Sequence, residues 1–459
     1  MKNNSIYTLI AALFLALSSA TAQNSAKPLL SGYLQTDQRL LLKKPGNWAW
    51  NENRLSLQLN KKVAGRAKFH SEIWLRNMGL PAAATSADLF NKGIVDPWNL
   101  EIRDAYVRIT GLFTPGLDVT IGRQRIAWGT ADKFNPTDNV NPYDLEDILD
   151  FGRHRASDAI SLQYYFNSDY SLQAVFLPFF QPWNMPVGVF SSVLTPDFQF
   201  PFEGMYLKNY SDTLEMPQYN FKQSANAGFR FKGFAAGIDF SFSYLYTREG
   251  LPFSVYNSLS PADTLGGIAV RSVMRYPRVH IIGADFAANL FGAGLWAEAA
   301  LYIPRDSVVM STDISPWING GIKPVTIDST VLKKTPYLKF VIGADYSFAN
   351  NTYLNVQFLH GFINERGKDN LNDYFIVRYE INLLNNNLKL VPLSGGAAIT
   401  RWSHISDNYA LFYVPEISYM ATSNLELNLS AGIFGGKSDN FFSKLNDYDM
   451  VIFKMKYSF

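Results

Sequence analysis

The clearest pattern in the chain is an alternation of apolar and polar positions in its final segment, from Asp447 to Phe459. From residue 451 onward one parity is apolar, while the other carries Ile452, Lys454, Lys456 and Ser458. Successive side chains of a β-strand point to opposite faces. The segment therefore predicts a strand with one apolar and one polar face. The apolar row consists of Val451, Phe453, Met455, Tyr457 and Phe459.

The same alternation recurs inside the chain. Apolar residues occupy every second position of residues 234–246, 338–348 and 375–383, and only Leu245 breaks the opposite row of the first segment. A soluble β-sandwich also alternates, but its strands are usually shorter than these stretches of about a dozen residues. A polar row that carries charges fits the wet interior of a membrane barrel. The inner rows of the last two segments contain Lys339, Asp345, Arg378 and Glu380.

Asn-rich and Gly-rich turns divide the chain into strands. Eight short turns are predicted at residues 60–64, 111–116, 167–169, 232–233, 289–292, 349–351, 385–387 and 422–424. Nine longer connections alternate with them, at residues 43–51, 78–97, 129–157, 181–217, 248–275, 306–335, 364–372, 403–408 and 436–446. Seventeen connections give eighteen strands. The least regular strands are those at residues 29–42 and 388–402, so sixteen strands is the alternative.

The fold class that follows is all-β, a transmembrane antiparallel β-barrel of about eighteen strands. Past the N-terminal segment no uncharged apolar run is long enough for a membrane helix, so a closed barrel is the remaining way to satisfy the backbone inside a bilayer. Short turns and both termini are expected on the periplasmic side, with the longer loops outside. One barrel, residues 23–459, is expected to use the whole mature chain.

The N-terminus predicts export. Lys2 precedes an apolar stretch at residues 6–17, and Ala20, Thr21 and Ala22 form a small-residue site, so residues 1–22 are expected to be a signal peptide cleaved before Gln23. A chain that ends its last strand on Phe459 resembles bacterial outer-membrane barrels. This resemblance implies a location in the outer membrane, contact with its lipid and lipopolysaccharide, and recognition of the last strand by the barrel-assembly machinery.

Composition narrows the chemistry. The chain has no cysteine, which excludes disulfides and thiolate sites, and its formal charge of +2 gives no sign of a nucleic-acid partner. Aromatic residues make up 15%, which suits the two belts of aromatic residues that surround membrane barrels at the membrane–water interfaces. No cofactor or metal site is predicted.

The third long connection, residues 129–157, is the least ordinary segment. It follows the run Gly122-Arg123-Gln124 and Trp128-Gly129, and it contains two Asn-Pro pairs at residues 135–136 and 141–142. This combination resembles a porin-like outer-membrane family of undefined function and, more distantly, the alginate-export barrels. The resemblance covers roughly residues 100–180. It implies a channel-like barrel and points to no particular solute.

The parity of residues 117–122 would turn Arg123 and Arg125 toward lipid if the strand continued regularly. Arginine facing the bilayer midplane costs about 2 to 4 kcal/mol. Either a bulge near Gly122 flips the register or the arginines lie above the apolar band, and we expect the bulge. It would place both arginines in the lumen, beside the inward residues Asp104, Tyr106 and Arg108 of the preceding strand.

The acidic residues of the third connection are then expected to fold inward and meet these arginines. In one interpretation the pairs form a pore constriction whose field selects charged or zwitterionic solutes. In another the same pairs only pin the loop and seal the barrel, and in a third the carboxylates bind calcium, although their spacing matches no EF-hand. The predicted constriction set is Asp104, Arg108, Arg123, Arg125, Asp132, Asp138 and Asp144.

An enzyme is not expected. The histidines show no metal-binding spacing and no recognisable partner, and the row that contains His360 points outward, whereas His70 points inward. We therefore expect a porin-like channel for small polar or charged solutes. The alternatives are a non-conducting barrel with a structural or surface-assembly role, or a carrier for hydrophobic or saccharide ligands. The aromatic fourth loop, from Phe179 to Phe202, fits either a lid over such a ligand or an ordered surface loop.

Overall fold

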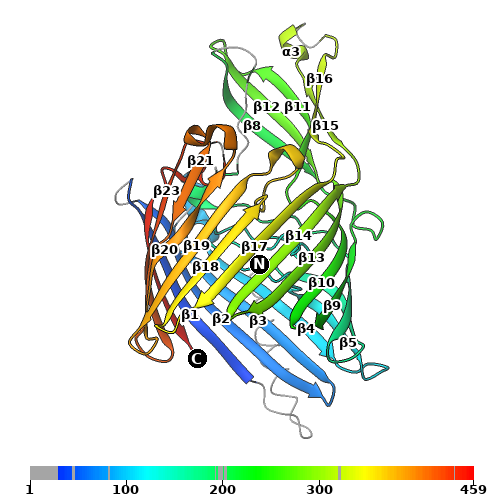
Figure 1. The fold of residues 1–459 in the computed structure, drawn as a ribbon. Helices are drawn as coiled ribbons and strands as arrows, with labels where there is room; N and C mark the ends of the chain where they lie inside the picture. The colour runs from blue at the N-terminus through cyan, green and yellow to red at the C-terminus, as the bar shows by residue number, and fades with distance from the viewer. Residues whose placement is uncertain are drawn as a thin grey trace.

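The computed structural model describes residues 29–43, 47–80, 83–191, 193–194, 200, 204–318, 322–438 and 440–459. The predicted signal peptide lies outside these residues. The described chain forms a tilted antiparallel barrel with a smaller sheet standing on one end (Figure 1). The helices of the described chain are short, with at most six residues: η1 (Asp88–Phe90), α2 (Lys92–Val95), η2 (Gly188–Phe190), α3 (Ser315–Ile318), η3 (Lys368–Asn370), η4 (Trp402–Asp407) and η5 (Ser443–Leu445). Within the described ranges no helix has the length and apolarity to cross a bilayer.

Eighteen strands close the barrel. β1 pairs with β2 on one side and with β24 on the other, which seals the sheet. β21 and β22 are two halves of one strand interrupted at Val414 and Pro415, since both pair with β20 and β23. The prediction of eighteen strands is therefore confirmed, and the alternative of sixteen is wrong. The barrel strands are β1 (Leu29–Leu41), β2 (Trp48–Ala64), β3 (Ala67–Met78), β4 (Trp98–Ile109), β5 (Leu117–Gln124), β6 (Ser157–Tyr165), β7 (Tyr170–Leu177), β9 (Asn226–Ala235), β10 (Ile238–Arg248), β13 (Arg278–Leu290), β14 (Ala293–Pro304), β17 (Tyr337–Ser347), β18 (Thr352–His360), β19 (Asp373–Leu383), β20 (Leu388–Ile399), β21 (Tyr409–Tyr413), β22 (Glu416–Met420), β23 (Leu425–Gly436) and β24 (Met450–Ser458).

Six of the eight predicted short turns lie where the sequence places them, and two are misplaced. β2 continues to Ala64, so its turn falls at Gly65 and Arg66. The turn between β9 and β10 falls at Ala236 and Gly237, whose φ angles of 52° and 80° reverse the chain. The alternating segment 234–246 is therefore the end of β9 and most of β10, and its rows change face at the hairpin, where Phe234 stands opposite Asp239.

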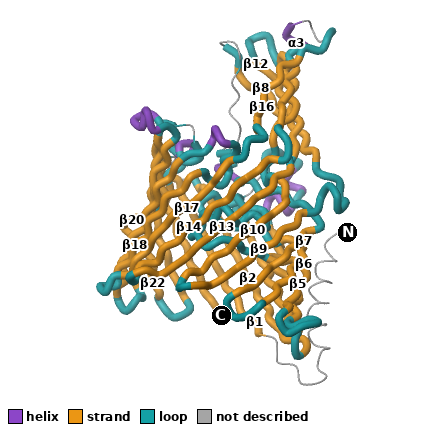
Figure 2. Tube along the Cα trace, turned by 45° about the vertical axis from the view of Figure 1, so that its right-hand side comes forward, coloured by secondary structure: helices purple, strands orange, loops and turns teal. Residues whose placement is uncertain are grey.

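A second sheet of five strands grows out of three of the long connections. Its order is β16, β15, β11, β12, β8, with β11 parallel to β15 and β12 parallel to β8. It rises above one side of the barrel rim (Figures 1 and 2). Sequence analysis predicted only loops here, since every residue of β8 is exposed and no apolar row marks it. Its strands are β8 (Tyr206–Glu215), β11 (Phe253–Pro261), β12 (Gly267–Arg275), β15 (Val308–Asp313) and β16 (Thr326–Leu332).

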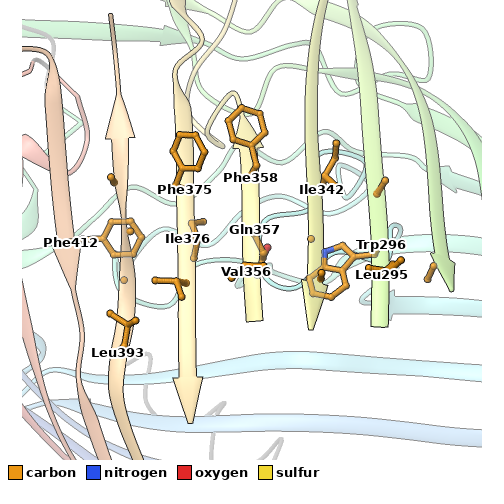
Figure 3. Close-up of a pocket in the computed structure, with 18 of the residues that line it drawn as sticks. Leu295, Trp296, Ile342, Val356, Gln357, Phe358, Phe375, Ile376, Leu393 and Phe412 are labelled. Carbon is orange, nitrogen blue, oxygen red and sulfur yellow. The ribbon is translucent and has the colours of Figure 1, made fainter. Parts of the chain in front are cut away.

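The outer wall is apolar. Phe453, Met455 and Tyr457 of β24 are each about 40% exposed or more, as predicted for a row that faces lipid. A concavity of about 1110 Å3 also lies on this wall, lined by small residues such as Ala297 and Ala344 and by larger ones such as Phe358 and Phe375, the last two of which are labelled in Figure 3. Lipid chains cover such a face in a bilayer, so we do not regard this concavity as a solute site.

Candidate functional site

The third long loop, residues 125–156 (loop 3), folds into the barrel. The Gly-Arg-Gln and Asn-Pro motifs build its base. The buried Gln124 side chain donates to the carbonyl oxygen of Ala159 at 3.0 Å, and Asn141 accepts from the amide of Ile126 and donates to the carbonyl oxygen of Gln124. Gly122 has a φ of 125°, and a Cβ there would collide with the carbonyl oxygen of Ala105. The motif is thus a set of side-chain bonds that fix how the chain leaves β5.

Glu298 of β14 anchors the first part of loop 3. Its carboxylate accepts from the amides of Thr130, Ala131 and Thr137 at 2.9, 3.1 and 2.7 Å, and from the Thr137 hydroxyl at 2.8 Å. Glu298 is 1% exposed. A Cβ at Gly129 would collide with this carboxylate, so glycine is required for the approach. Loop 3 therefore crosses the lumen from β5 to β14.

Arginines of the opposite wall hold the second part of loop 3. Arg39 of β1 binds Asp147 through two bonds of 2.7 and 2.5 Å, and Arg76 of β3 binds Glu146 at 2.8 Å. Arg103 of β4 binds Asp144 at 3.2 Å and donates to the carbonyl oxygen of His154. Loop 3 is consequently tied to the wall on both sides of the lumen.

The wall arginines are themselves supported from the strands. Arg39 also pairs with Asp37, and Arg76 with Glu52 and Glu101. Arg54 and Arg103 lie over the Trp74 ring, 3.9 and 4.3 Å from its centre. Aromatic stacking and multiple carboxylates keep these guanidinium groups in place, because each group would otherwise be buried with unpaired charge.

This charge network shifts the pKa values of the loop carboxylates. Burial alone would raise the pKa of Asp147, but Arg39 outweighs it and holds that pKa well below its usual range. Burial is likewise outweighed at Asp144, where Arg153 and Arg103 lower the pKa. At Glu146 burial prevails over Arg76 and raises the pKa. Loop 3 is therefore held by ionised Asp144 and Asp147 at neutral pH.

Aromatic packing seals the middle of loop 3. Tyr143 lies between His154 and Trp183, with ring centres 4.0 and 4.7 Å away. The His154 ring nitrogens face the carbonyl oxygens of Gly152 and Asp138, and burial lowers the pKa of this histidine. Trp183, together with Phe180 and Phe190, shows that the described part of the fourth loop packs on its neighbours.

A polar cavity of about 630 Å3 lies inside the barrel below loop 3. Its upper side is formed by loop 3, including Asp132, Lys133 and Asp150. Its wall extends down to Glu426 and Lys456, which stand directly opposite each other next to the periplasmic turn. Five cationic and four anionic side chains line the cavity, so the interior is mixed in charge. They are Arg54, Lys133, Arg378, Lys454, Lys456, Asp132, Asp150, Glu416 and Glu426.

The extracellular end of the lumen is apolar and packed. Loops contribute Phe134, Phe190, Phe362 and Phe442 to a cluster with inward residues of β17–β24, and all four side chains are almost fully buried. A second cluster packs Trp128 and Val140 against the inner face of β10–β17. The inward loops thus narrow the outer mouth well beyond what loop 3 does alone.

The expected bulge at Gly122 is wrong. β5 pairs with β6 from Leu117 to Gln124 without a register shift, and Arg123 stands opposite Asp158 in the outward row of Ile121 and Ile160. The bulge lies one strand earlier, in β4, where Arg103 is the extra residue between Ile102 and Asp104. Arg123 is therefore on the outer face.

Of the remaining residues of the predicted constriction set, Asp104, Arg125 and Asp138 lie together, and the other three lie apart from them. Arg125 bonds Asp138, and its amide donates to Asp104 at 3.0 Å. Arg108 lies farther down the wall and donates to Thr120. Asp144 is buried among arginines, and among the seven residues only Asp132 lines the cavity.

The predicted lining residues are also divided. Arg378 faces the cavity, and Glu380 pairs with it at 2.5 Å. Asp345 bonds the Tyr353 hydroxyl, whereas Lys339 is buried and donates to the carbonyl oxygens of Phe362 and Ile363. Lys339 thus fixes the start of the seventh long loop, residues 361–372.

Sequence analysis missed the wall arginines. Arg39 shares the inward parity of Gln35 and Asp37, and Arg76 shares that of Glu72 and Trp74. Their position in the inward rows of the first and third strands was therefore the signal in the sequence that identifies these two arginines. Arg103 depends on the bulge and could not be placed from its parity.

Two of the loop carboxylates that we considered as calcium ligands are instead paired with arginines. Asp138 and Asp144 are bound by Arg125 and Arg153, while Asp132 is in the cavity. In the described part of the chain, no group of three or more His, Asp or Glu side chains is placed to hold a metal ion.

The sequence model of the family described as "Protein of unknown function (DUF1302)" matches residues 96–459, about four fifths of the chain. The chain belongs to this family. None of the curated proteins matches it. The DUF1302 chain is also similar to solved outer-membrane proteins, at low identity. OmpT of Vibrio cholerae in its trimer form is 10% identical with a TM-score of 0.42, covering 95% of this chain and 100% of OmpT.

Two further solved structures give the same level of likeness to the DUF1302 chain. The OmpF complex with daunomycin from Salmonella typhi is 9% identical with a TM-score of 0.41, covering 94% of this chain and 98% of OmpF. The outer-membrane channel DcaP of Acinetobacter baumannii is 10% identical with a TM-score of 0.38, covering 95% and 99%. The site must therefore be interpreted from its own residues.

Proposed function

We propose that this protein is an outer-membrane channel for small polar or charged solutes, narrowed by loop 3. The observation that carries the proposal is the charged cavity below loop 3, inside a closed barrel whose outer wall is apolar. A structural barrel needs no charged interior space of about 630 Å3, which is within the volume range of small-molecule sites. A mixed-charge lining is what a selective passage for ions or zwitterions requires.

We place the charge-selecting part of the proposed path between loop 3 and the wall of β1, β2 and β24. Asp132 and Asp150 stand on the loop side, while Arg54 and Lys454 stand on the wall side. This arrangement replaces the predicted constriction at Arg123 and Arg125. Opposite charges across a gap produce a transverse field, which orients a zwitterionic solute and slows a hydrophobic one.

The second candidate function is a non-conducting barrel with a structural or surface-assembly role. The packed aromatic cluster around Phe134, Phe362 and Phe442 favours it, because it occupies the outer mouth. The five-stranded extracellular sheet also offers a surface for assembly. On this alternative the charged cavity is a closed vestibule.

Single-channel recording of the folded mature protein in a planar bilayer separates the two functions. Glu426 and Lys456 are a matched pair, since they face each other across β23 and β24 and both line the cavity. For the channel, we expect discrete conductance steps. Lys456→Gln should shift ion selectivity toward cations and Glu426→Gln toward anions, each by roughly a factor of two, or about 0.4 kcal/mol.

Lys333→Gln is the control, because Lys333 is exposed on the extracellular side and pairs with Asp369. It should leave selectivity unchanged. Silence from protein that is shown to be folded by its heat-modifiable mobility would reject the channel and support the assembly role.

A further inference from the structure

Arginines gather outside the lumen, where β10, β13 and β14 end below the extracellular sheet. They line a crevice of about 680 Å3 between the barrel rim and the sheet, which we call the rim crevice. The lining includes two carboxylates, Glu215 and Asp306, against four guanidinium groups, which leaves a formal excess of two positive charges. The four residues are Arg248, Arg275, Arg278 and Arg305.

Three of these arginines stand on the lipid-facing side of the rim. Arg248 shares the outward parity of Phe242, which is 49% exposed, and it is paired directly with Arg278 on β13. The amide of Arg305 donates to the carbonyl oxygen of Arg278 at 3.0 Å. Neighbouring strands thus bring three guanidinium groups to one level of the outer wall.

This arrangement lacks local counter-charge. Like charges directly opposite each other in a sheet destabilise it. Among the described residues no carboxylate lies within 4.0 Å of either Arg248 or Arg278, whereas Arg275 pairs with Glu215 and Arg305 with Asp306 at 3.6 Å. The first two instead donate to uncharged oxygens, chiefly the Gln223 carbonyl. Those bonds satisfy the donors without neutralising the charge.

The rim crevice lies at the level of a membrane interface. The Arg278 guanidinium is 4.8 Å from the centre of the Tyr246 ring, and Arg305 reaches the Tyr246 hydroxyl at 3.5 Å. One step lower, the Tyr244 hydroxyl bonds His280 at 2.8 Å. Tyrosines of this kind mark the depth of lipid headgroups, and the apolar row below them faces acyl chains.

We propose that the rim crevice binds the phosphate group of a lipid headgroup in the outer leaflet. Guanidinium groups form short, charge-assisted bonds to phosphate oxygens and match their geometry. The phosphate supplies the counter-charge that Arg248 and Arg278 lack. A lipid is favoured over a free ion because the crevice opens outside the lumen, and Ile282 and Phe286, 47% and 43% exposed on the wall below, contact the attached chains.

Binding is tested with the folded protein in an uncharged detergent, using native mass spectrometry and a phosphorylated lipid A as the probe. The same lipid without its phosphates is the paired probe, and we expect at least a tenfold weaker interaction for it. Arg305→Gln should weaken phosphorylated-lipid binding severalfold. Asp306→Asn should strengthen it, since it removes a carboxylate beside the site. Both side chains are largely exposed, so neither change affects folding.

Lys437→Gln serves as the control, because it removes an equally exposed cation that follows β23 and does not line the crevice. The proposal fails if the two lipids bind equally or if Arg305→Gln and Asp306→Asn both leave binding unchanged. It also fails if inorganic phosphate competes as strongly as the lipid itself, because the attached chains would then contribute nothing. Arg248→Gln with Arg278→Gln should give the largest loss, but the exposed pair decides the test if this variant does not fold.

Discussion

Arg39 and Asp147 form a buried two-bond ion pair that connects the first strand of the barrel to the middle of loop 3. The Arg39 side chain is 0% exposed and that of Asp147 is 7% exposed. Arg39→Leu leaves buried Asp147 without its ion-pair partner and leaves Asp37 with Lys454 alone, whereas Asp147→Leu leaves Arg39 still paired with Asp37. We expect Arg39→Leu to cost about 3 to 5 kcal/mol of unfolding free energy and Asp147→Leu to cost less. The double variant should cost clearly less than the sum.

Urea unfolding in detergent micelles, followed by electrophoretic mobility, measures these free energies. The exposed pair of Lys437 and Asp407, 3.4 Å apart, is the matched control and should contribute at most about 1 kcal/mol. Strict additivity of Arg39→Leu and Asp147→Leu would show that the two side chains do not stabilise each other.

Arg123 and Arg125 should behave differently although they are two residues apart. Arg123 stands on the outer face opposite Asp158, so Arg123→Ala should leave conductance unchanged. Arg125 binds Asp138 in the base of loop 3, so Arg125→Ala should loosen residues 126–141 and raise conductance. Single-channel recording and hydrogen exchange of that segment provide the two readouts. Equal effects of the two substitutions would contradict the register of β5.

The barrel could be predicted because lipid on one side and water on the other impose a clear contrast on each strand. The same reasoning failed at Ala236 and Gly237, since Phe234 continues the apolar alternation of β10 in the sequence although its pairing with Asp239 puts it in the opposite row. It also failed for the extracellular sheet, because β8 is exposed on both faces and its sequence shows no alternation of apolar and polar residues.

The candidate site was predictable only in part. Acidic residues in loop 3 correctly indicated pairing with arginines, and Arg125 does pair with Asp138, but parity missed Arg39, Arg76 and Arg103 and wrongly turned Arg123 inward. A bulge shifts every later residue of a strand by one face, and its position depends on the neighbouring strand. The bulge at Arg103 is fixed by pairing between β3 and β4, which no local pattern in the sequence records.

Glu298→Ala should release the first part of loop 3 while the barrel stays closed. The change leaves the amides of Thr130, Ala131 and Thr137 without an acceptor, and each unsatisfied buried amide costs about 1 to 3 kcal/mol. We expect larger and noisier conductance steps with unchanged heat-modifiable mobility. Asp285→Asn is the control, because Asp285 is the cross-strand neighbour of Glu298 and bonds Ser241. If both variants conduct like wild type, Glu298 does not hold the loop.

Acid should detach the second part of loop 3 in two stages. Burial lowers the pKa of His154, so the released loop takes up a proton as pH falls below about 6.5 and the docked loop loses stability. Asp144 and Asp147 have lowered pKa values when docked. Their contribution is complete above about pH 4 and is lost as pH falls through the docked values.

Glu146 and Asp150 oppose both stages, because burial raises their pKa values and the docked form therefore binds these protons first. His154, Asp144 and Asp147 favour release against these two, and the pKa of Asp147 is lowered strongly, so we expect net release on acidification. Hydrogen exchange of residues 142–156 between about pH 7.5 and pH 2 measures both stages. His154→Gln should abolish the stage that begins below about pH 6.5 and leave the stage below about pH 4 intact. A single transition that is unaffected by this substitution would show that His154 does not control the docking of loop 3.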